Sequence, residues 1–104
     1  MTLPSMLRIR QALPTDALSD PADVTAKELA RIGLSNIVHV GEQVGICIGS
    51  RGIRDLPTVV EVVVKAVSDL NAHPVLVPAM GSHGGGTAEG QQKIIESYGI
   101  TEQF

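Results

Sequence analysis

A glycine-rich run at residues 78–89, Pro-Ala-Met-Gly-Ser-His-Gly-Gly-Gly-Thr-Ala-Glu, separates an apolar segment from a helical one. Glycine readily adopts positive φ and lets a ligand approach the backbone closely, and the N–H groups that open a helix attract anions. His83 lies in the middle of this run. We therefore expect a loop between a strand and a helix, with an imidazole placed where it could move a proton.

The segments on either side of this loop predict an α/β fold. Residues 6–11 form a possible edge strand. The other expected elements are a helix from Asp20 to about Ile32 stopped by Gly33, a strand at 44–48, a valine-rich helix at about 56–71, a strand at 75–77 and a helix at about 87–98. This order is typical of right-handed βαβ units with a mostly parallel sheet. We expect one α/β domain over residues 1–104, resembling part of a Rossmann-like domain.

The apolar run from Val44 to Ile48 has no alternation of polar and apolar residues. This pattern favours a strand of a parallel sheet that is covered on both faces. Cys47 lies in this run and is expected to pack in the core, as free cysteines usually do. The chain has one cysteine, which excludes both a disulfide framework and a cysteine metal site.

Composition excludes several classes of function. The net charge is −3 and aromatic residues make up 2% of the chain, which argues against phosphate neutralisation and base stacking on a nucleic acid. The sequence contains no membrane-spanning apolar stretch and no signal peptide, which predicts a cytoplasmic protein. Three histidines, His39, His73 and His83, lack the spacing of a metal site, so we expect none.

Two tetrapeptides echo each other, Gly49-Ser-Arg-Gly52 and Gly81-Ser-His-Gly84, and each follows an apolar strand. If the strands are neighbours, both loops lie at the carboxyl edge of the sheet, where open α/β sheets bind ligands. Backbone N–H groups, hydroxyls and cationic side chains there suit a phosphate or a carboxylate. The candidate binding residues are Ser50, Arg51, Arg54, Gly81, Ser82 and Gly84. Neither a complete Walker motif nor a Gly-x-Gly-x-x-Gly motif occurs.

Each charged candidate has two interpretations. His83 is either a surface histidine in a tight turn or a group for acid/base work and anion contact. Arg51 and Arg54 are either solvated charges and ion-pair partners of Asp55, or anion ligands.

The two loops resemble the amino-terminal part of the lactate racemase family, the nickel-dependent racemases and epimerases of 2-hydroxy acids. The resemblance is carried by Ile48-Gly-Ser-Arg-Gly-Ile53 with Leu56-Pro-Thr58, and by Val77-Pro-Ala-Met-Gly-Ser-His-Gly-Gly85 with Thr87-Ala-Glu-Gly90. It implies a nickel-pincer nucleotide held between two domains, with His83 as one of two general acid/base residues. Arg54 takes the place of a family arginine near the cofactor or the substrate carboxylate. Arg51 and Gly84 depart from the family pattern, which puts lactate itself in doubt.

By the same resemblance, the second acid/base histidine, the cofactor-attaching lysine and the nickel ligand would lie beyond Phe104. We therefore expect an amino-terminal fragment whose partners are a carboxy-terminal domain, a small 2-hydroxy acid and, in one reading, a second copy of the chain. On its own the fragment would be inactive. The residues also leave open a non-catalytic phosphate- or nucleotide-binding module, and an interaction fragment that associates through its valine-rich helix.

Overall fold

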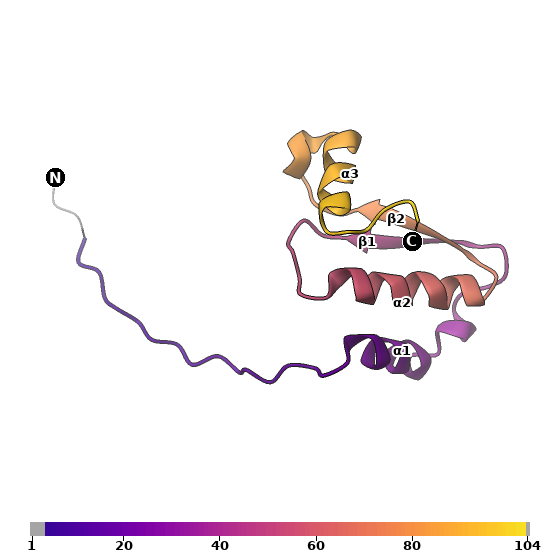
Figure 1. The fold of residues 1–104 in the computed structure, drawn as a ribbon, viewed down its shortest axis with the longest axis horizontal. Helices are drawn as coiled ribbons and strands as arrows, with labels where there is room; N and C mark the ends of the chain where they lie inside the picture. The colour runs from indigo at the N-terminus through magenta and orange to yellow at the C-terminus, as the bar shows by residue number, and fades with distance from the viewer. Residues whose placement is uncertain (1–3, 104) are drawn as a thin grey trace.

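A computed structural model describes residues 4–103 of the 104-residue chain (Figure 1). Its elements are α1 (Pro21–Arg31), a 3-10 turn η1 (Leu34–Asn36), β1 (Gln43–Ile48), α2 (Leu56–Asp69), β2 (His73–Pro78), a short turn η2 (His83–Gly86) and α3 (Ala88–Ser97). These bounds confirm the three predicted helices and the strands at 44–48 and 75–77 to within a few residues.

Both strands belong to one βαβ unit. β1 and β2 pair in parallel, from Gln43 opposite His73 to Ile48 opposite Pro78, and α2 makes the crossover between them. The described residues thus form a mixed helix and strand structure with a two-stranded parallel sheet. Because the strands are parallel neighbours, the loops that follow them emerge at the same edge of the sheet.

Local signals explain where the helices begin and end. The Asp20 carboxylate caps α1 by accepting the Asp23 N–H at 2.9 Å, and Pro21 fills the first helical turn. Gly33 follows the helix with a φ of +69°, the left-handed stop predicted from the sequence. The Thr87 hydroxyl caps α3 by accepting the Gly90 N–H at 3.1 Å.

Two apolar clusters hold the elements together. One joins Ile48 of β1, Val60 of α2 and Ile95 of α3 with Met80 and Ile100. The other joins Val67 of α2 to Val38 and Ala72, with Val44 of β1 packed against it. Both clusters include even-numbered side chains of β1. α1 packs against the side of α2 that faces away from the sheet (Figure 1). The helices that contact the sheet therefore cover one of its faces.

The opposite face of the sheet is open to solvent, which corrects two expectations. Burial alternates along both strands, and Cys47 is exposed. Val75 and Val77 on the same face retain 42% and 38% of their accessible surface. The prediction of a strand covered on both faces and a core position for Cys47 was wrong, because an unbroken apolar run does not reveal how many layers pack against it.

Residues 4–19 also differ from expectation. They form no regular secondary structure, and the whole segment is exposed. Met6, Leu7 and Ile9 retain 93%, 88% and 85% of their accessible surface. Figure 1 shows this amino-terminal arm running away from the folded body. In this single chain the predicted edge strand at 6–11 is wrong, because no neighbouring strand pairs with it.

Candidate functional site

The two loops predicted from the sequence meet at the carboxyl edge of the sheet. Nδ1 of His83, in the loop after β2, is hydrogen-bonded to the hydroxyl of Ser50, in the loop after β1. The Tyr98 hydroxyl, at the end of α3, donates to the Ser50 backbone carbonyl. Ser50 therefore links both loops to α3, and its contacts orient an exposed imidazole whose Nε2 is the nitrogen left for a ligand.

The loop after β2, residues 79–87, owes its shape to glycine. Gly81 and Gly84 have φ values of +57° and +64°, a backbone region that side chains with a Cβ rarely adopt. Gly84 also lies directly against Gly90 in the first turn of α3. A Cβ on Gly90 would lie 1.8 Å from the Gly84 carbonyl oxygen, and one on Gly84 would lie 2.5 Å from the Gly90 carbonyl carbon. Both positions therefore require glycine.

Two polar side chains of α3 and its cap fasten the same loop. The Gln91 amide donates to the carbonyl of Gly81 at 2.7 Å and to that of His83 at 3.3 Å. The Thr87 hydroxyl donates to the Gly84 carbonyl at 3.2 Å. These bonds hold the backbone of His83 against α3, which is a rigid element on which to mount a proton-transfer group.

The loop after β1, residues 49–55, is held less tightly. Arg51 is exposed, and Arg54 keeps 92% of its side-chain surface while its Nε lies 3.6 Å from the Asp55 carboxylate. Within residues 4–103, the N–H groups of Ser50, Arg51 and Gly52 donate no hydrogen bond. This loop can therefore offer backbone donors and cationic side chains to an anion.

The candidate residues divide into two groups. Ser50, His83, Gly81 and Gly84 belong to one hydrogen-bonded unit with α3. Among the described residues, the exposed side chains of Arg51, Arg54 and Ser82 form no hydrogen bond with His83. Sequence reasoning missed the structural parts played by Gly90, Gln91 and Tyr98. The Gly84 and Gly90 pair was visible in the sequence, but its close approach depends on how η2 folds onto α3.

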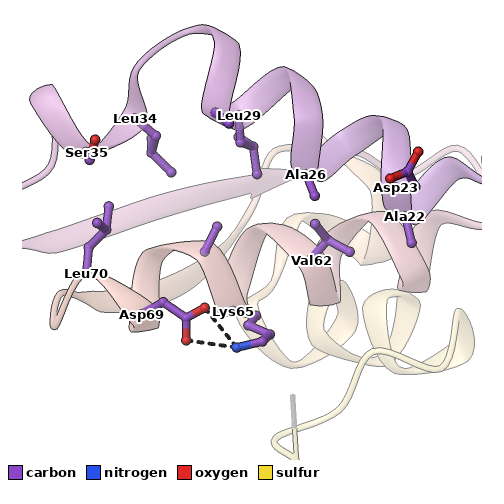
Figure 2. Close-up of a pocket in the computed structure, with 12 residues that line it drawn as sticks. Ala22, Asp23, Ala26, Leu29, Leu34, Ser35, Val62, Lys65, Asp69 and Leu70 are labelled. Atoms are coloured by element: carbon purple, nitrogen blue, oxygen red, sulfur yellow. Dashed lines mark hydrogen bonds and ion pairs between the residues drawn. The ribbon is translucent and has the colours of Figure 1, made fainter.

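Two hollows on the described surface are lined by neither Ser50 nor His83. A groove of about 600 Å³ runs between α1 and α2, lined mainly by apolar side chains such as Ala26, Leu29 and Val62, with the ion pair of Lys65 and Asp69 at its border (Figure 2). None of its lining residues belongs to the two loops. The second hollow, about 570 Å³, lies between the end of β2 and α3, and Gln91 lines it. It lies beside the loop after β2, because Gln91 also donates to the carbonyls of Gly81 and His83.

Among residues 4–103, no three His, Cys, Asp or Glu side chains gather closely enough to hold a metal ion. Over the same residues, no helix has the length and apolar character needed to cross a bilayer.

The comparisons with known proteins add no relative. No protein-family model, no curated protein and no solved structure was found to match the chain.

Proposed function

We propose that this chain supplies the amino-terminal half of the active site of a lactate-racemase-like isomerase, with His83 as a general acid/base. The observation that carries the proposal is the His83 to Ser50 hydrogen bond at the carboxyl edge of the sheet. Oriented through Nδ1, the imidazole leaves Nε2 free to accept a proton from a substrate hydroxyl and to return it. We propose in addition that the βαβ unit is part of a Rossmann-like sheet.

The chemistry explains why a base is needed at this place. A 2-hydroxy acid changes configuration when its α-carbon loses a hydride and regains it on the other face. The hydroxyl must give up its proton as the hydride leaves, because a carbonyl group forms at that carbon. An imidazole accepts and returns a proton near neutral pH.

The described residues fit one part of the cofactor that the resemblance implies. The donors of the loop after β1 suit the anionic groups of a nucleotide, with Ser50, Arg51, Arg54 and the glycine loop as the residues in contact. Among the described residues, the His, Cys, Asp and Glu side chains do not group into a nickel site. We therefore assign no metal ligand to these residues. When bound, the nickel-pincer nucleotide would supply the hydride acceptor.

The test uses protein produced from its natural gene together with the enzymes that make the pincer nucleotide. Nickel content, intact mass and the racemisation of single-enantiomer 2-hydroxy acids are measured. We expect nickel loading and racemisation, with His83→Asn lowering kcat by about 100-fold or more at unchanged nickel content. His39→Asn is the matched control, since it makes the same substitution at an exposed histidine outside both loops. Absence of both nickel and racemisation, or full activity of His83→Asn, would contradict the proposal.

A second candidate, a non-catalytic phosphate- or nucleotide-binding module, is favoured by one observation. The free N–H groups and the two exposed arginines lie in the loop after β1 and need no histidine to bind an anion. Calorimetric titration with inorganic phosphate and with ADP separates the two. A module should lose affinity on Arg51→Ala and keep it on His83→Asn, without racemising any 2-hydroxy acid.

A further inference from the structure

The two edges of the sheet differ in what they offer another strand. The β2 His73 N–H donates to the Glu42 carbonyl at 2.7 Å, and the Ala79 N–H donates to the Ile48 carbonyl at 2.8 Å. Because bonding residues alternate along each strand of a parallel pair, odd-numbered residues of β2 and even-numbered residues of β1 turn their backbone groups toward each other. The remaining residues of each strand turn theirs outward.

This alternation closes one edge and opens the other. On β2 the outward residues are Pro74, Leu76 and Pro78, and because proline has no N–H, this edge can donate only once. On β1 the outward residues are Gln43, Gly45 and Cys47, each of which carries both an N–H and a carbonyl. Within the described chain no strand covers them. An open edge of this kind is a template for strand addition.

The amino-terminal arm has the sequence pattern that this edge requires. Leu7 and Ile9 alternate with Arg8 and Arg10, the two-residue period of a strand with one covered and one wet face. On an added strand, Leu7 and Ile9 would lie on the face that holds Val44 and Ile46. Leu34 and Leu70 pack in the cluster with Val44 and also line the apolar groove of Figure 2. The arginines would then lie on the open face with Cys47.

We propose that residues 6–11 of one copy add as a strand to the β1 edge of a second copy, in a reciprocal exchange between two chains. A second copy is the occupant that the observations favour, because the arm leaves its own body instead of folding back. The molecule measures 64 Å along its longest axis and 35 Å along the next, and the arm runs along the longest axis (Figure 1). The nine residues from 12 to 20 can span about 30 Å, enough to reach a neighbour.

Disulfide crosslinking tests the register and the partner at once, because Cys47 is the chain's only cysteine. Single cysteines are placed at Arg8, Arg10, Leu7 and Ile9. After mild oxidation, Arg8→Cys or Arg10→Cys should give a disulfide-linked dimer through Cys47, since these positions share its face. Leu7→Cys and Ile9→Cys are the matched controls from the opposite face. Adding Cys47→Ser should abolish the dimer band.

The solution mass supplies the second arm of the test. Light scattering after size exclusion should find a dimer that the double variant Arg8→Pro/Ile9→Pro converts to a monomer, because one of the two N–H groups removed faces β1 whichever way the added strand runs. Asp16→Pro, outside the paired segment, should leave the dimer intact. A monomeric wild type, a dimer unaffected by the double proline variant, a disulfide within one chain, or equal crosslinking from all four positions would each overturn the proposal.

Discussion

The two Gly-Ser-x-Gly loops are nearly the same in sequence but are built differently. The loop after β2 is fastened to α3 by the contact of Gly84 with Gly90, by Gln91 and by Thr87. The loop after β1 is tied down through Ser50 and leaves both arginines exposed. Similar tetrapeptides are therefore held in different ways. The loop after β2 fixes the backbone of His83 against α3, whereas the loop after β1 leaves two cationic side chains exposed.

Gly90→Ala should lower the stability of the protein more than any other variant considered, because it disrupts the attachment of the loop after β2 to α3. Alanine is normally better than glycine in a helix by about 1 kcal/mol, but here its Cβ would meet the Gly84 carbonyl oxygen at 1.8 Å. We expect a net loss of about 1–3 kcal/mol in the free energy of unfolding, measured by urea denaturation. Gly49→Ala is the control in the other loop, because its Cβ would meet no atom within 4 Å. Equal stability of the two variants would show that the Gly84 and Gly90 contact is absent.

Tyr98→Phe should loosen the loop after β1 alone. The variant removes the hydroxyl that donates to the Ser50 carbonyl and keeps the ring in the core cluster. We expect a loss of about 1 kcal/mol, together with lower backbone NMR order parameters at Arg51 and Gly52 and unchanged order parameters at His83. Lower order parameters across both loops would mean that they do not move independently.

These residues show what a sequence can and cannot predict. The sequence correctly predicted the Asp20 cap, the Gly33 stop and the two strand-to-helix loops. Each of these features depends on neighbours only a few residues away. The Tyr98 bond to Ser50 joins residues 48 positions apart, and no local pattern marks it. The exposure of Cys47 was missed for another reason. Its apolar run is compatible with one or with two covering layers, and only the packing of α2 and α3 decides between them.

Gln91→Ala should have a smaller effect, confined to the loop after β2. It removes the two bonds to the carbonyls of Gly81 and His83. Because Gly81 and His83 are exposed residues, water can replace the lost donor, and we expect a loss of about 0.5–1 kcal/mol, measured by urea denaturation. Gln92→Ala, one residue along the helix, has no bond to the loop and is the control. A larger effect from Gln92→Ala would refute the role given to Gln91.

Arg54→Ala should change stability least, by less than about 0.5 kcal/mol, because its ion pair with Asp55 is exposed. Its effect should appear in binding instead. We expect phosphate affinity measured by calorimetry to fall in Arg54→Ala, while Lys65→Ala, on the far part of α2, leaves it unchanged. Equal affinity in wild type and Arg54→Ala would remove Arg54 from the anion site.

The bond between His83 and Ser50 is the most direct test, since it joins the rigid loop to the open one. Long-range proton–nitrogen NMR spectra of the histidine rings, recorded for wild type and Ser50→Ala, measure it at the atoms concerned. We predict that the Nδ1 and Nε2 resonances of His83 move in Ser50→Ala, whereas those of His39 and His73 stay in place. If the His83 resonances do not move in Ser50→Ala and behave like those of the exposed His39, the loop after β1 does not orient the imidazole, and the proposal of an acid/base role for His83 fails.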